Sequence, residues 1–227
     1  MTRLLLLGSP LLGPRVWAPL ADELVRRGRQ VSVAQPARRV ESPADVVRAF
    51  LEAVPPGEPV VLVPHSNAGL YVAAVAAAVP VQGLVFVDAG LPSPLLRAPT
   101  APDWLRERLA DLVGPDGLLP PWTRWWPEAD VDGLFPDPDT RRAVELEQPR
   151  LPLAYFDAEV PTPVGWERLP AAYLAFGDAY ADERAEAVRR GWPVATERGG
   201  HLHMLVDPAG VADALTGLLD AWGNESG

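Results

Sequence analysis

The sequence contains no cysteine, no lysine and no isoleucine, and it has only three histidines. Without cysteine the chain can form no disulfide, no thiolate nucleophile and no cysteine-ligated zinc site. Three histidines are also too few to favour a multi-histidine metal site. We therefore expect a protein that uses no metal and no other cofactor.

Positive charge is scarce as well, since 20 arginines stand against 30 acidic residues and the formal net charge is -10. Nucleic-acid phosphates would be repelled by such a surface. Long apolar runs are also missing. The four leucines at 4–7 are too short for a signal-peptide core, and Pro80 breaks the alanine-rich run after Asn67. We expect a cytoplasmic protein that acts on a small molecule, has no nucleic-acid or membrane partner, and exists as a monomer or homodimer.

What the 227-residue chain does contain is a series of short apolar runs that alternate with helical patterns, in a composition that is 48% hydrophobic. Runs without polar alternation are typical of strands buried on both faces of a parallel sheet. The order strand–helix–strand predicts an α/β fold, a doubly wound and mainly parallel sheet of about six strands. The predicted strands are 3–8, 30–36, 59–65, 83–90, 171–178 and 192–200.

Residues 91–170 interrupt this alternation. They contain two helical patterns, at 102–114 and 137–148, separated by proline-rich connections, and no convincing strand. Five of the eight tryptophans also fall in this segment. We interpret residues 91–170 as a helical cap inserted into an α/β core formed by residues 1–90 and 171–227.

Polar side chains follow several of the predicted strands. Ligands bind at the carboxyl ends of strands in open α/β sheets, so these residues are candidates for a site. Ser66 follows the third strand, Asp88 stands near the end of the fourth, Asp178 ends the fifth with Asp182 just beyond it, and His201 follows the sixth. Serine, carboxylate and histidine in this order form a nucleophile, an acid and a base. The competing interpretation is structural, with Ser66 or Asn67 merely capping the following helix.

Four segments carry a resemblance to the α/β-hydrolase superfamily, and most closely to its short, single-domain bacterial serine hydrolases with a small cap. They are "GSPLLGPRVWAPLADELVRRGRQV", "PHSNAGL", "VFVDAGLP" and "GGHLHMLVDP". The resemblance covers nearly the whole chain and implies the α/β-hydrolase fold, with Ser66 on a tight strand–helix turn. The sequence departs from the family at Pro64 and Ala68, which replace two elbow glycines. It also lacks a His-Gly after the first strand and a clear Gly-x-x-Asp after the fifth.

The base and the acid of the implied triad each have alternatives. His201 matches the family's catalytic histidine, since two glycines precede it and Pro208 follows seven residues later, and we favour it over His203. Most relatives carry the acid after the fifth strand, where Asp178 and Asp182 stand. Some carry it one strand earlier, where this chain has Asp88. We favour Asp88 and keep the other two as alternatives.

The resemblance also implies an oxyanion hole, which needs two backbone N–H groups. One belongs to Asn67, the residue after the nucleophile. The other comes from the loop after the first strand, and because Pro10 has no N–H it is that of Ser9 or Leu11. The side chain of Asn67 could either reach the site or cap the helix.

The tryptophans of the cap predict an apolar substrate pocket. Trp122, Trp125 and Trp126 cannot all be buried in a thin insertion, and we expect at least one to face the cleft. His65 adjoins the nucleophile and His203 follows the base, so we also place both beside the substrate.

Three functions are consistent with these residues. The first is a serine hydrolase that cleaves an ester, thioester or amide of a small hydrophobic molecule through an acyl-serine intermediate. The second is a non-hydrolytic eliminase, lyase or cyclase of a biosynthetic pathway, in which the histidine–aspartate pair acts as a base. The third is a catalytically silent binding protein, which an intact Ser66 and His201 argue against.

Overall fold

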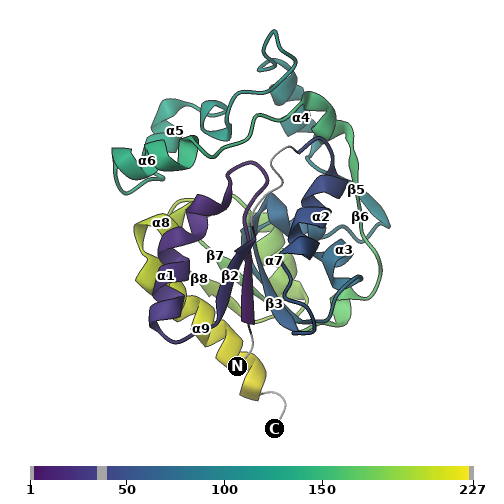
Figure 1. Cartoon of the computed structure of the whole chain (residues 1–227), viewed down its shortest axis with the longest axis vertical. Helices are drawn as coiled ribbons and strands as arrows, with labels where there is room; N and C mark the ends of the chain where they lie inside the picture. Colours follow the sequence, from purple (N-terminus) through teal and green to yellow (C-terminus); the bar gives the residue numbers. More distant parts are fainter. Residues whose placement is uncertain (1–2, 35–39, 225–227) are drawn as a thin grey trace.

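A computed structural model describes residues 3–34 and 40–224 (Figure 1). The ends of the predicted core, and residues 35 and 36 of the second predicted strand, lie outside these ranges. Among the described residues, six strands form one sheet in the order β2-β1-β3-β4-β7-β8, and every neighbouring pair is parallel. The strands are β1 Arg3–Leu7, β2 Val31–Ala34, β3 Val60–Ser66, β4 Val81–Ala89, β7 Ala171–Ala175 and β8 Val194–Thr196. The predicted α/β class and six-stranded parallel sheet are confirmed.

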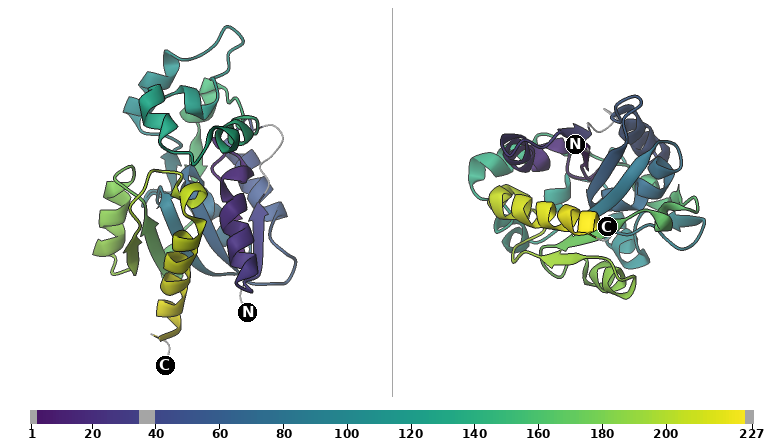
Figure 2. Two further views of the ribbon diagram at one scale, coloured as in Figure 1. Left: turned by 90° about the vertical axis from the view of Figure 1, so that its left-hand side faces the viewer. Right: turned by 90° about the horizontal axis from the view of Figure 1, so that it is seen from below.

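Helices cover both faces of this sheet. Figure 1 shows α1 (Ala18–Arg26), α8 (His203–Val206) and α9 (Pro208–Asn224) on one side, where α1 packs against both of the others. The opposite side carries α2 (Pro43–Glu52), α3 (Val72–Ala76) and α7 (Ala181–Arg189). Two views at right angles show the same layers (Figure 2). Helices on both faces are the arrangement that right-handed strand–helix–strand crossovers produce.

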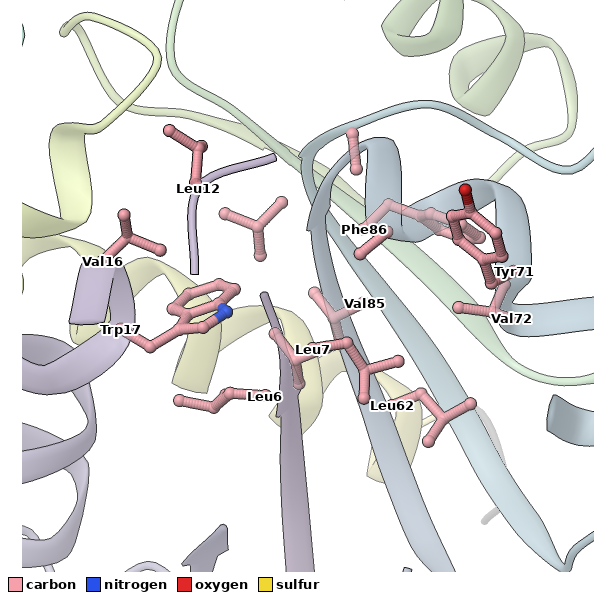
Figure 3. Packing of buried hydrophobic residues seen from close by; sticks show 14 of the residues in the cluster. Leu6, Leu7, Leu12, Val16, Trp17, Leu62, Tyr71, Val72, Val85 and Phe86 are labelled. Atoms are coloured by element: carbon pink, nitrogen blue, oxygen red, sulfur yellow. The ribbon is translucent and has the colours of Figure 1, made fainter. Parts of the chain in front are cut away.

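The core lies between the sheet and these helices. The four leucines of β1 are each at most 2% exposed, which explains why the run shows no polar alternation. Trp17, at the end of the 3-10 helix Pro14–Trp17, packs on one face of the sheet, while Tyr71 and Phe86 lie toward the other (Figure 3). Burying each such side chain contributes about 1.5–3 kcal/mol to folding.

Residues 91–170 add no strand to the six-stranded sheet. Their helices α4, α5 and α6 lie beyond the carboxyl ends of its strands, and the last part of the segment runs down beside the sheet to the start of β7 (Figure 1). The prediction that this segment lacks strands is wrong, because β5 and β6 form a small antiparallel sheet of their own. Each has only three residues and contains a proline, too little for a period of two to appear in the sequence. The segment's elements are β5 Arg97–Pro99, α4 Asp103–Ala110, 3-10 helix Trp122–Arg124, α5 Glu128–Asp132, α6 Pro138–Glu145, 3-10 helix Leu153–Asp157, β6 Glu159–Pro161 and 3-10 helix Trp166–Arg168.

Each helix among the described residues is too short or too polar to cross a membrane.

Candidate active site

Ser66 is the last residue of β3 and stands on a strained turn. Its φ of 58° is a backbone conformation that residues other than glycine rarely adopt. The 3-10 helix Asn67–Tyr71 begins at the next residue, and the Ser66 side chain makes no capping hydrogen bond to it. The helix-cap interpretation of Ser66 therefore fails on geometry, and the strain has to serve another purpose.

The chain packs tightly at this turn although Pro64 and Ala68 replace the two usual glycines. The close approach occurs instead between Gly69 and Gly90. A Cβ added to Gly69 would lie 1.9 Å from the carbonyl oxygen of Gly90, so the helix passes directly over the end of β4. Pro64 pairs with Leu7, the last residue of β1, where the ladder between the two strands ends. A missing N–H is tolerated at such a margin.

The acid at the end of β4 contacts the base. Asp88 Oδ2 lies 2.6 Å from Nδ1 of His201, and Asp88 Oδ1 accepts the N–H of Phe176 at 3.2 Å. Asp88 is 1% exposed and has a positive φ of 41°. Burial alone raises the pKa of this carboxyl, but the hydrogen bond and charge of His201 together with the Phe176 N–H outweigh burial and hold the pKa below its usual value. Asp88 is thus an ionised partner for the imidazole.

The two alternative acids lie elsewhere. Asp178 is 90% exposed and pairs with Arg184 at 3.4 Å. Asp182 is exposed in the first turn of α7, where the helix dipole stabilises a negative charge. Neither bonds to His201 among the interactions of the described residues, so the geometry assigns the histidine to Asp88.

His65 and His203 lie behind the site and outside the residues that line the cavity. His65 is fully buried, its ring stacks on that of His201 at 4.4 Å, and its Nε2–H donates to the His201 carbonyl oxygen at 2.9 Å. Burial, and then the charge of His201, lower the pKa of His65 to about 3, so the ring is neutral. The ring of His203 packs edge-on against Phe176. The geometry gives His65 a supporting contact with the base and gives neither residue access to substrate.

A residue that the sequence did not single out completes the contacts of Ser66. The hydroxyl of Tyr180, from the loop between β7 and α7, lies 3.2 Å from Ser66 Oγ. No hydrogen bond between Ser66 and His201 occurs among the described residues. Tyr180 follows a strand end as the other candidates do, and this position was the one signal that could have identified it.

Of the predicted oxyanion donors, Asn67 directly follows Ser66, and Ser9 and Leu11 lie in the loop after β1. The N–H of Leu11 donates to Oγ of the buried Ser9 at 3.3 Å, which leaves the Ser9 N–H as the less committed of the two candidates. The side chain of Asn67 neither caps the helix nor points at Ser66. It donates to the carbonyl oxygen of Thr100 at 2.9 Å and accepts from Tyr71 at 3.2 Å, and so fastens residues 91–170 to the turn.

Ser66, Asp88, Tyr180 and His201 line a cavity of about 960 Å³ beneath residues 91–170. Tryptophans supply much of the rest of its wall. Trp122 and Trp125 are only 8% and 3% exposed, yet both face the cavity because their buried rings form its lining. Trp126 is only partly buried, so the three are not all buried, and all three line the cavity. The aromatic residues of the wall are Trp104, Trp122, Trp125, Trp126, Phe156 and Tyr180.

Carboxylates supply the charge of the cavity. Asp130, Asp178, Asp182 and Glu183 line it, and no arginine does so among the described residues. Burial, followed by the charges of Asp182 and Asp88, raises the pKa of the Glu183 carboxyl. Within the described part of the chain, no three His, Asp or Glu side chains lie together so that they could hold a metal ion.

Solved structures with the same fold match almost the entire chain. An extracellular α/β-hydrolase from a Paenibacillus species, described as sharing structural and functional homology with tobacco salicylic acid binding protein 2, superposes with a TM-score of 0.74 at 14% identity, covering 96% of this chain and 99% of its own. Polyneuridine aldehyde esterase gives 0.70 at 17% identity, with 97% and 99% covered. Tomato methylketone synthase I, in a variant complexed with beta-ketoheptanoate, gives 0.60 at 13% identity, with 97% and 98% covered.

At these identities the likeness shows the fold alone. No curated protein matches the sequence. A family model described as the alpha/beta hydrolase family matches residues 4–214, which is nearly the whole chain. The protein therefore belongs to the alpha/beta hydrolase family, as the four sequence segments predicted.

Proposed function

We propose that this protein is a serine hydrolase that cleaves an ester, thioester or amide of a small hydrophobic molecule through an acyl-Ser66 intermediate. One observation carries the proposal. The 2.6 Å contact between His201 Nδ1 and the buried Asp88 stands in the same cavity wall as a serine held at a φ of 58°. A carboxylate that accepts from Nδ1 leaves the opposite ring nitrogen, Nε2, free to act as a base.

The proposed reaction begins when Ser66 Oγ attacks the substrate carbonyl carbon. His201 Nε2 takes the serine proton as the new C–O bond forms, and Asp88 stabilises the imidazolium that results. The N–H of Asn67, together with that of Ser9 or Leu11, stabilises the oxyanion. The proton then passes from Nε2 to the leaving group as its bond to carbon breaks. A water molecule repeats these steps on acyl-Ser66 and releases the acid.

The cavity supports an apolar substrate of modest size. Its volume of about 960 Å³ suits a small molecule, and four tryptophans with Phe156 offer large apolar faces. One protein with the same fold, polyneuridine aldehyde esterase, is an esterase by name. Cytoplasmic location, the monomeric or homodimeric state, and residues 91–170 as a separate cap domain stay predictions.

Labelling with a fluorophosphonate probe tests the proposal. We expect one probe molecule per chain on Ser66, and no label and no turnover in Ser66→Ala, because the acyl acceptor is gone. Ser93→Ala is a matched control, since Ser93 bonds only the N–H of Leu95 on a loop. Full turnover of acyl substrates by Ser66→Ala would refute the proposal.

A non-hydrolytic enzyme of the eliminase, lyase or cyclase type is the second candidate. It is favoured by the contact of Ser66 with Tyr180 in place of His201, and by a fold shared with a methylketone synthase. In such an enzyme the His201–Asp88 pair removes a proton and Ser66 only positions the substrate. Mass spectrometry of the quenched reaction separates the two candidates, because only the hydrolase accumulates an acyl adduct. A silent binding protein would show ligand binding with neither an adduct nor turnover.

A further inference from the structure

Tyr180 stands at the strand end that lacks a Gly-x-x-Asp. It is the third residue after Gly177, in the loop that connects β7 to α7. Because Asp88 at the end of β4 bonds His201, this loop does not have to supply the carboxylate that orients the histidine. The loop instead presents a tyrosine hydroxyl to the nucleophile, 3.2 Å from Ser66 Oγ.

The ring of Tyr180 packs against the imidazole ring of His201. Its centroid lies 5.6 Å from that of His201, with the two planes tilted by 34°. The ring also faces the cavity. Tyr180 thus touches one reacting atom, packs on the group that moves the proton, and has access to substrate.

The order of the strands fixes the side of Ser66 on which this hydroxyl lies. β1 borders β3 on one edge, and its loop carries the oxyanion candidates Ser9 and Leu11. β4 and then β7 lie on the other edge, and they bring Asp88 and Tyr180. In the tetrahedral intermediate the oxyanion points to the first side. The leaving-group oxygen has to face His201, from which it takes its proton, and this is the side of Tyr180.

We propose that Tyr180 is a catalytic residue whose hydroxyl donates a hydrogen bond to the leaving-group oxygen of an ester substrate during acylation. This inference rests on the proposed hydrolase function and extends it to the choice of leaving group. In the free enzyme the hydroxyl bonds Ser66 Oγ. When Oγ bonds the carbonyl carbon, the Tyr180 hydroxyl turns its hydrogen bond to the leaving-group oxygen.

The step needs no additional proton. The proton removed from Ser66 passes through His201 Nε2 to the departing alkoxide, while the Tyr180 hydroxyl keeps its own and only shares it. Burial raises the pKa of the Tyr180 hydroxyl above its usual value, so the group stays a neutral donor over the working range of the enzyme. The donor acts at the moment when negative charge grows on the leaving oxygen, and hydrogen bonds to charged groups are the stronger ones.

Tyr180→Phe, assayed on two esters with the same acyl group, tests the inference. An alkyl ester has a basic leaving group that needs this donor, whereas a p-nitrophenyl ester leaves as a stable anion. We expect kcat/KM for the alkyl ester to fall about 10- to 100-fold, and that for the aryl ester to fall less than about threefold. The ratio of the two rates is independent of the folded fraction, so a partly folded sample still reports it.

Tyr173→Phe is the matched control. The Tyr173 hydroxyl bonds the backbone of Ala89 beside Asp88 and does not contact Ser66, so its loss can perturb the site but should leave the ratio unchanged. An equal fall for both esters in Tyr180→Phe would overturn the inference, and so would a gain in activity, which would mean that Tyr180 restrains Ser66. Probe labelling of Ser66 in Tyr180→Phe reports on the hydrolase function separately, so the two proposals can fail independently.

Discussion

At the scale of single residues, the site depends on which carboxylate holds the imidazole. Three were candidates, and only Asp88 is both buried and in contact with His201. Sequence position could not decide among them, because each stands at or just beyond the carboxyl end of a strand of the same sheet. The difference is one of burial, since Asp88 is buried whereas Asp178 and Asp182 are exposed.

Substitution of the acid should therefore be far more damaging at one position than at the others. In Asp88→Asn the amide can no longer fix the Nδ1–H tautomer or stabilise the imidazolium, and we expect kcat to fall about 10³- to 10⁴-fold. Asp178→Asn should change kcat less than about threefold, because that side chain is 90% exposed. Steady-state hydrolysis of one activated ester measures both. A larger loss in Asp178→Asn than in Asp88→Asn would assign the acid to the β7 loop.

His65 predicts how stability depends on pH. Its pKa is about 3 in the folded protein and about 6.5 in the unfolded chain, so between these values only the unfolded state binds the proton. Stability is therefore complete above about pH 6.5 and falls as the pH drops. We expect a loss on the order of 2–3 kcal/mol between pH 7.5 and 4.5, measured by urea unfolding.

His65→Phe is the comparison for this measurement, because phenylalanine keeps the ring contacts and does not titrate. Its stability should fall by that much less over the same interval. The lowered pKa of Asp88 also makes folding weaker in acid, but this effect belongs below about pH 4. Parallel pH profiles for the two proteins would show that His65 is not held neutral.

Tyr180 is a site residue that residue type alone does not predict. A tyrosine carries no formal charge and resembles a core residue in the sequence, so the search for strand-end carboxylates passed over it. The prediction for His203 shows the opposite error, because its position two residues after His201 suggested that it contacts substrate. The chain turns into α8 at that point and carries the ring toward Phe176.

At the scale of elements, the sequence predicted what long patterns encode. All six sheet strands were identified from their short apolar runs. The inner strands β1, β3, β4 and β7 are largely buried on both faces, whereas the outer strands β2 and β8 are only partly buried. The helix that follows Ser66 opens as the 3-10 helix Asn67–Tyr71 before α3 (Val72–Ala76) continues it. The strands β5 and β6 were missed because three residues are too few to show a pattern.

The turn between β3 and this helix gives a prediction for Gly69. A Cβ there would meet the Gly90 carbonyl oxygen at 1.9 Å, so Gly69→Ala must push the helix away from β4. We expect a loss of about 2–3 kcal/mol of unfolding free energy, and a fall in kcat greater than the unfolded fraction explains, because Ser66 moves with the helix. Denaturant unfolding and hydrolysis assays on the same samples measure the two effects.

Gly217→Ala is the control for this substitution. Gly217 lies within α9, and a Cβ at that position would meet nothing within 4 Å. The same chemical change should there stabilise the protein by about 0.5–1 kcal/mol, because alanine favours a helix. A tolerated Gly69→Ala would mean that the turn has more room than the close approach implies.

At the scale of the whole molecule, the fold brings together residues that lie far apart in the sequence. Ser66 and His201 are separated by three further sheet strands and the whole of residues 91–170. The sequence predicted their meeting because parallel strands all end at one edge. The shape of the cavity could not be predicted in the same way, since it depends on how residues 91–170 settle over that edge through contacts such as Asn67 with Thr100.

The charge of the molecule and the charge of its cavity have the same sign, and this predicts which substrates enter. The net charge is -10, and the described cavity residues include four carboxylates besides Asp88 and no arginine. An anionic substrate meets repulsion both on approach and in the cavity, whereas a cation is attracted and can contact the face of a tryptophan ring.

Three esters with the same acyl group test this charge preference: a choline ester, its uncharged 3,3-dimethylbutyl analogue, and an ester of similar size whose alcohol part carries a carboxylate. We expect kcat/KM to be highest for the cation and about tenfold lower for the anion than for the neutral ester, with the differences shrinking in 0.5 M salt because screening shortens the range of the field. Equal rates for the three at low salt, or a preference for the anion, would show that solvent neutralises these carboxylates before substrate reaches Ser66.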